Sequence, residues 1–208
     1  MAISLSACST TPTPTARALP DISRANTAII VIEFQQTWTE KGVFHRMIRS
    51  ELERNNTVAN TIQFLKDART EGISIIQAPL ILDRKNKEQY QKMPLIPKLF
   101  RAFTADTWKA EYTEGIYQES DIVVEGRHGF DACEGSDLLA ILDSLSVERL
   151  LFCGFTTEHC VEMTMNTLSQ KGYDCLLISD CTATKSKRLQ AKVESRQKSI
   201  LSTAVFSY

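Results

Sequence analysis

Leu150-Leu151-Phe152-Cys153-Gly154-Phe155-Thr156-Thr157-Glu158-His159-Cys160-Val161 is the stretch that decides the fold. Its apolar first half predicts a buried strand, Gly154 interrupts that run, and Glu158 begins a helical pattern. Cys160 is therefore expected in the first turn of a helix, where unpaired backbone N–H groups and the positive end of the helix dipole favour a thiolate and can bind an oxyanion. The stretch predicts a nucleophilic cysteine. The alternative is that Cys160 is a small, buried apolar residue.

The composition is that of one soluble globular domain. The chain has 208 residues, of which 43% are hydrophobic, and a net charge of -1. The even balance of acidic and basic residues excludes the basic surface of a nucleic-acid-binding protein, and no apolar run is long enough to span a membrane. The six cysteines form no C-x-x-C pair. They indicate reduced thiols rather than a disulfide framework or a zinc site.

Residues 1–25 differ from the rest of the chain, because they are rich in Ser, Thr and Pro and poor in large apolar residues. We expect them to form a disordered leader and residues 26–208 to form the folded domain. Leu5-Ser6-Ala7-Cys8 resembles the cleavage box of bacterial lipoproteins, but the basic segment and long apolar core of a signal peptide do not precede it. We therefore expect a cytoplasmic protein. The alternative is an exported lipoprotein anchored through Cys8, with a true start that lies upstream.

Strand-like apolar runs alternate with helical patterns along the domain. The strands are expected at residues 28–33, 73–79, 121–125, 149–155, 175–179 and 204–206, and the helices at 51–69, 137–145, 158–171 and 185–201. Because the main strands are continuously apolar, they predict a mostly parallel sheet that is covered on both faces. The fold class is therefore a three-layer α/β/α domain with a doubly wound sheet of roughly six strands. The mixed segment 80–120 is expected to form a lid or pocket wall.

Three reactive side chains follow three of these strands. Glu33 follows the first strand, Arg127 the third and Cys160 the fourth. Ligands of doubly wound sheets bind beyond the carboxyl ends of the strands, so we expect the three side chains to converge there. The alternative for Glu33 and Arg127 is a buried ion pair with a structural role only. His128, beside Arg127, is a second candidate base or else a solvated loop residue.

Three segments carry a resemblance to a known family. VIEFQQTW at 31–38, VEGRHGFDA at 124–132 and GFTTEHCV at 154–161 together resemble the isochorismatase-like cysteine hydrolases. That superfamily includes nicotinamidases, carbamoyl-amidohydrolases and isochorismatases. The likeness extends in order from about Ala28 to the C-terminus, so that only the leader lies outside it.

The resemblance implies a catalytic triad. The family usually has Asp, Lys and Cys at the three positions where this chain has Glu33, Arg127 and Cys160. One branch of the family carries Glu at the first position, whereas Arg at the second position keeps the charge but adds a planar fork and does not lose its proton. The resemblance also implies a cis peptide bond between Phe155 and Thr156. The backbone N–H groups of Thr156 and Cys160 would then form an oxyanion hole.

Four residues are candidates for the substrate pocket. Trp38 and His159 match pocket positions of the family, although each could also be an ordinary packing residue. Trp108 belongs to the expected pocket wall in segment 80–120. Gln77, together with Arg84, is a candidate for orienting a carboxylate-bearing substrate.

The expected function is hydrolysis of a C–N bond in a small amide, imide or ureido compound through a thioester. The three histidines, His45, His128 and His159, lack the Asp-x-His arrangement by which the family's nicotinamidases hold a metal, so we expect no metal and no cofactor. The alternatives are hydrolysis of an isochorismate-like substrate, a weakened relative that binds a metabolite or senses oxidants, and a scaffold role. The expected partners are a small-molecule substrate and, by resemblance, further copies of the chain in a homodimer or homotetramer.

Overall fold

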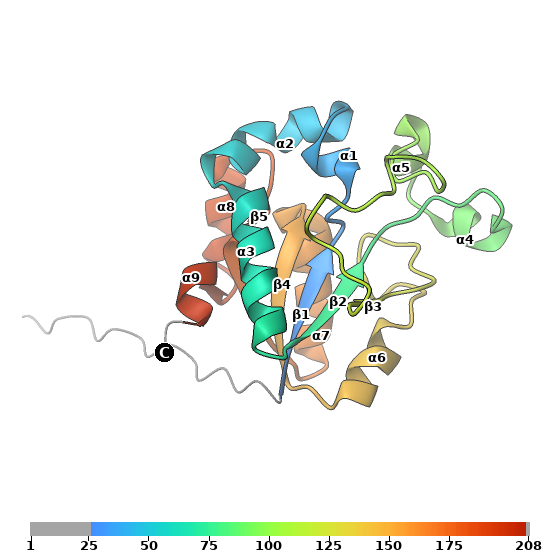
Figure 1. Cartoon of the computed structure of the whole chain (residues 1–208). Helices are drawn as coiled ribbons and strands as arrows, with labels where there is room; N and C mark the ends of the chain where they lie inside the picture. The colour runs from blue at the N-terminus through green and yellow to red at the C-terminus, as the bar shows by residue number, and fades with distance from the viewer. Residues whose placement is uncertain (1–25, 207–208) are drawn as a thin grey trace, which may run out of the picture.

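The computed structural model describes residues 26–206, which form a parallel sheet between helices (Figure 1). The expected leader and Cys8 lie outside the described residues. The strands are β1 (Thr27–Ile32), β2 (Ser74–Ala78), β3 (Ile122–Val123), β4 (Arg149–Phe155), β5 (Asp174–Ala183) and β6 (Ser199–Ile200). Their order in the sheet is β3-β2-β1-β4-β5-β6, and all neighbours are parallel. The predicted doubly wound α/β fold is confirmed, and the strand order reverses between β1 and β4.

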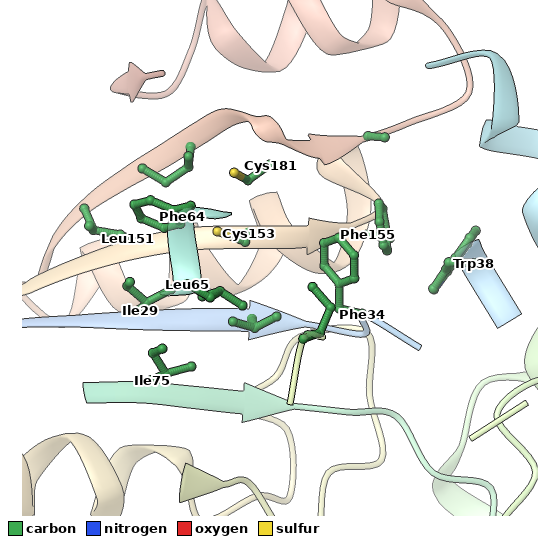
Figure 2. Close-up of a cluster of buried hydrophobic side chains, with 14 of the residues drawn as sticks. Ile29, Phe34, Trp38, Phe64, Leu65, Ile75, Leu151, Cys153, Phe155 and Cys181 are labelled. Atoms are coloured by element: carbon green, nitrogen blue, oxygen red, sulfur yellow. The ribbon is translucent and has the colours of Figure 1, made fainter. Parts of the chain in front are cut away.

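Helices cover both faces of the sheet because its central strands are apolar on both sides. All six residues of β1 are buried, and its side chains alternate between two hydrophobic clusters. On one face pack α2 (Val43–Arg54), α3 (Thr57–Thr70) and α9 (Ser202–Val205); on the other pack α6 (Leu138–Leu145), α7 (Glu162–Gln170) and α8 (Lys187–Glu194). Figure 2 shows the first cluster, where Phe64 and Leu65 of α3 lie over Ile29 and Leu151. This continuous burial holds the strand ends in place.

Gly154 allows β4 to lie directly against β1. It pairs with Ile32 in the sheet and has a φ of +115°. A Cβ atom at this position would lie 1.9 Å from the carbonyl oxygen of Ile32, so no larger residue fits. The strand continues through Gly154 to Phe155. The interruption that the sequence predicted at Gly154 is a shift in the pairing register with β5, between Phe152 and Gly154.

The helix expected at 51–69 is two helices. α2 ends at Arg54 and α3 begins at Thr57, because Asn56 takes a left-handed conformation with a φ of +51°. Asparagine tolerates this conformation better than most residues, so the break is local in origin. The helix expected at 158–171 also has two parts, a π-helical turn η2 (Thr157–Val161) and then α7.

The C-terminal expectations are partly wrong. The helix expected at 185–201 ends at Glu194 as α8, and the last strand is β6 rather than residues 204–206. Residues 202–205 form the short helix α9, whose first residue, Ser202, donates its backbone N–H and its hydroxyl to the carboxylate of Asp180. This side-chain contact fixes a helical turn that the apolar pattern alone did not predict.

Segment 80–120 lies beyond the carboxyl ends of the strands and contains α4 (Lys87–Lys92) and α5 (Leu95–Phe100) (Figure 1). The short helix α1 (Gln36–Thr39) faces it from the end of β1. Leu82 and Thr104 form a bridge inside the segment, which closes it into a loop over this end of the sheet. In the described part of the chain, no helix is long and apolar enough to cross a bilayer.

Candidate active site

Glu33 and Arg127 form a buried ion pair at the carboxyl end of the sheet. The Nη2 of Arg127 lies 2.5 Å from the Oε1 of Glu33, and each side chain is 1% exposed. Glu33 follows β1 directly, with a φ of +51°, whereas Arg127 follows β3. Because β2 separates these strands in the sheet, the long arginine side chain crosses the end of β2, where its Nη1 donates to the carbonyl of Ala78 at 2.7 Å.

The guanidinium of Arg127 is held by its own loop as well as by Glu33. Its Nε donates to the carbonyl of Gly129 at 3.1 Å, and its Nη2 donates to the carbonyl of Phe130 at 2.7 Å. Together with Ala78 and Glu33, these contacts give the side chain four oxygen acceptors. A guanidinium has five N–H donors in a fixed plane, so four contacts define its position and leave little freedom to move.

Cys160 lies in the π-helical turn that follows β4 and is 3% exposed. Its thiol interacts electrostatically with Glu33 and with Arg127. Burial raises the pKa of the Cys160 thiol well above its usual range, the Glu33 carboxylate raises it further, and Arg127 opposes them. The helix N-terminus alone predicted a resting thiolate, but burial outweighs it. The resting group is therefore a thiol rather than a thiolate.

The peptide bond between Phe155 and Thr156 is cis, as the resemblance implied. Thr156 is buried, and its carbonyl accepts the backbone N–H groups of His159 and Val161. These contacts form the turn that carries Cys160.

Hydrogen bonds fix the Cys160 turn against the loop that carries Arg127. The hydroxyl of Thr164 donates to the carbonyl of Cys160 at 2.7 Å and accepts the backbone N–H of Ala132 at 2.9 Å. The carboxylate of Asp131 accepts the Thr167 hydroxyl at 2.6 Å. Thr164 and Asp131 were not predicted as site residues, although Asp131 lies inside one of the three matching segments.

Trp38 contacts the second oxygen of the Glu33 carboxylate. Its indole N–H donates to the Oε2 of Glu33 at 3.2 Å, and its ring packs against Phe44, Phe103 and Phe155. It is 5% exposed. Trp38 therefore orients the Glu33 carboxylate through its indole N–H, and this role is separate from its expected role in a substrate pocket.

Gln35 is a second supporting residue, and sequence reasoning missed it. Its side-chain amide donates to the carbonyls of Leu80 and Ala110 and accepts the backbone N–H of Leu80. It thereby ties the chain after β1 to both ends of the overlying segment. The available signal was an amide residue two positions after Glu33, directly after the apolar Phe34.

The structure does not bring Gln77 to this group. Its amide donates to the carboxylate of Asp121 at 2.9 Å, and Asp121 pairs with Arg69 of α3 at 2.7 Å. Gln77 is fully buried on the face that α3 covers, so it belongs to a structural network rather than to a substrate pocket. Arg84, its expected companion, is exposed on the loop after β2.

The remaining candidates also lie apart from the buried pair. His159 is exposed, and its ring contacts the carbonyl of Glu158. The His128 ring lies against Gly135, in the space that a Cβ atom there would need. Trp108 lines a cavity with residues of α2. Across residues 26–206, no group of three or more His, Cys, Asp or Glu side chains is arranged to hold a metal ion.

Comparisons with known proteins identify the family. The model of the isochorismatase domain matches residues 27–203. A cysteine hydrolase from Pseudomonas syringae pv. phaseolicola 1448A superposes with a TM-score of 0.74 at 17% identity, over 93% of this chain and 96% of that one. An N-carbamoylsarcosine amidase from Thermoplasma acidophilum gives 0.72 at 15% identity, over 88% and 99%. An isochorismatase family protein from Desulfovibrio vulgaris gives 0.73 at 18%, over 86% and 96%. The chain therefore belongs to the isochorismatase family of hydrolases.

Proposed function

We propose that this protein is a cysteine-dependent amidohydrolase that cleaves a C–N bond in a small amide, imide or ureido compound. The observation that carries the proposal is the buried Glu33–Arg127 ion pair, whose carboxylate and guanidinium both act electrostatically on the Cys160 thiol. A buried thiol needs a base within reach to become a nucleophile, and Glu33 is that base. The similarity to an amidase of known structure supports the same class of reaction.

In the proposed reaction, the Cys160 thiol gives its proton to Glu33, and the sulfur attacks the substrate carbonyl carbon. The carbonyl oxygen becomes an oxyanion, which the backbone N–H groups of Thr156 and Cys160 stabilise. Glu33 then gives the proton to the leaving nitrogen, the C–N bond breaks, and a thioester remains on Cys160. Glu33 next takes a proton from water, the hydroxide attacks the thioester carbon, the C–S bond breaks, and Glu33 returns the proton to the sulfur as the acid product leaves.

Arg127 has an electrostatic role in this proposal. Its guanidinium keeps its proton throughout the reaction. It stabilises the Cys160 thiolate when that forms, because the attraction between opposite charges is strong in a desolvated site. Four oxygen acceptors fix its position, so it does not move with the proton. Arginine in place of the family's usual lysine is therefore compatible with activity if the lysine also acts only through its charge.

The test is a panel of amides, imides, ureides and an isochorismate-like vinyl ether, with ammonia release and acid product as readouts. Wild type is expected to turn over at least one C–N substrate, whereas Cys160→Ala loses that turnover. Cys175→Ala is the matched control, since Cys175 is also buried but lies at the start of β5, at the opposite end of the sheet. A thioester on Cys160, trapped by hydroxylamine, identifies the intermediate. Turnover that persists in Cys160→Ala contradicts the proposal.

We further propose that the protein is cytoplasmic and forms a homodimer or homotetramer. Four apolar side chains of α5 are exposed, with fractions of 77% at Leu95, 57% at Ile96, 72% at Leu99 and 45% at Phe100. Such a group is larger than the scattered apolar residues of most monomer surfaces and supports association between chains. Light scattering after size exclusion gives the mass in solution. A monomer at all concentrations would contradict this part of the proposal.

A further inference from the structure

A cavity of about 190 Å³ lies between the start of α2 and the segment that contains α5. Phe44, Phe100 and Trp108 give it an apolar wall, and Lys41, Arg46 and Lys109 bring three cations to it. No acidic side chain lines it. This combination differs from the Cys160 site in both charge and position.

The cations of this cavity are not neutralised by neighbouring acids. Among the residues that the structure describes, Lys41 and Arg46 have no ion-pair partner, and Lys109 donates only to the carbonyl of Phe100 at 3.3 Å. The Nζ of Lys41 lies 4.8 Å from the centroid of the Trp108 ring, and the Nζ of Lys109 lies 6.0 Å from it. Two ammonium groups therefore lie near one indole ring without an ion-pair partner, which favours the binding of an anion at this cavity.

The cavity is separate from the Glu33 carboxylate. Phe44 lines the cavity and meets the Trp38 ring at 4.9 Å, edge to face, and Trp38 in turn donates to Glu33. Two aromatic side chains therefore stand between a ligand in the cavity and the proposed base. Glu33, Arg127 and Cys160 are not among the residues that line the cavity.

We propose that this cavity binds a small carboxylate with an aromatic or other compact apolar body, at a site distinct from the one that holds the substrate. The carboxylate would pair with Lys41 and Arg46, and Arg46 has the planar fork that suits two carboxylate oxygens. The apolar body would pack against Trp108 and Phe44. The cavity is smaller than the sites of drug-sized ligands, which are about 300–1,000 Å³, so the ligand is a compact acid rather than a large cofactor.

The experiment is calorimetric titration of the full chain with benzoate and with its neutral analogue benzamide. Benzoate is expected to bind wild type at least about tenfold more tightly than benzamide and more weakly as salt is added. The double variant Lys41→Gln/Arg46→Gln is expected to lose at least about tenfold in benzoate affinity. Arg49→Gln is the matched control, because Arg49 is an exposed cation of the same helix outside the cavity and pairs with Glu53.

The location of the bound acid is tested by fluorescence. The chain has two tryptophans, so Trp38→Phe leaves Trp108 as the sole tryptophan. Benzoate is expected to change Trp108 emission with the affinity that calorimetry gives. The proposal is overturned if wild type does not bind benzoate, if benzamide binds equally well, if Lys41→Gln/Arg46→Gln binds like wild type, or if Trp108 emission does not respond. None of these outcomes depends on hydrolysis, so the proposed function stands or falls separately.

Discussion

Replacement of Arg127 by methionine tests the energetic role of the buried ion pair. Methionine fills a similar volume, but it leaves the Glu33 carboxylate, 1% exposed, without its cation. Removing one partner of a buried pair typically costs about 3–5 kcal/mol. Three backbone carbonyls also lose a donor, so we expect the upper part of that range. Against a typical total stability of about 5–15 kcal/mol, this loss removes from about a third to all of the free energy of unfolding.

A second pair of variants makes the test quantitative. Glu33→Gln/Arg127→Met removes both charges, and its loss is expected to be about 2–3 kcal/mol smaller than the sum of the two single losses. Arg127→Lys keeps the charge but can make only part of the four contacts, so we expect a loss of about 2–3 kcal/mol. The assay is urea unfolding followed by circular dichroism at pH 7. Arg149→Met is the control, since Arg149 pairs with Asp174 where both are partly exposed, and we expect about 1 kcal/mol or less.

The reasoning is refuted by either of two results. One is a loss below about 1 kcal/mol for both Arg127→Met and Arg127→Lys, which would mean that the pair is solvated rather than buried. The other is strict additivity in the double variant, which would mean that Glu33 and Arg127 do not interact.

Three further predictions follow from the site and its supports. Gly154→Ala is expected to lower the free energy of unfolding by more than about 4 kcal/mol or to yield no soluble protein. The control is Gly172→Ala, where φ is +99° but the space for a Cβ atom is open, and thermal unfolding should show a loss of only about 1–2 kcal/mol. The raised pKa leaves the Cys160 thiol mostly protonated at pH 7. Its alkylation by iodoacetamide, followed by mass spectrometry, should therefore be slow at pH 7 and become faster as the pH rises. An alkylation rate that stays constant above neutral pH would contradict this. Trp38→Phe removes the N–H contact with Glu33 and should cost about 2 kcal/mol in urea unfolding, while unchanged stability would show that the contact is not made in solution.

The sequence predicted the sheet because its central strands are apolar without alternation. The run at 28–33 leaves no polar face for water, and this pattern identifies a strand buried on both sides. The two edge strands are different, because β3 and β6 have two residues each. β3 lies inside the strand expected at 121–125, whereas β6 has no apolar run of its own and depends on hydrogen bonds to β5. β6 lies inside the helix that was expected at 185–201, and α9 occupies most of the strand that was expected at 204–206.

The sequence also predicted that Glu33 and Arg127 meet, but not how they are held. Parallel strands end on the same side of a sheet, which was enough to bring Glu33, Arg127 and Cys160 together in expectation. The reach of Arg127 across β2 depends on three-dimensional distances that spacing does not contain. Gln77 has the residue type expected of a pocket. However, the alternation of side chains along β2 directs it to the face that α3 covers, where it donates to Asp121. The partners of such polar residues come from distant segments, so a local pattern cannot reveal them.

The brevity of β3 and β6 has a consequence for behaviour at high concentration. Fibril growth starts when an exposed strand adds a strand from another molecule through its free backbone groups. Each edge strand of this sheet has only two residues, which is too few to template a stable intermolecular ladder. Concentrated native protein should therefore resist ordered amyloid deposition, and contacts between molecules should form through side chains instead.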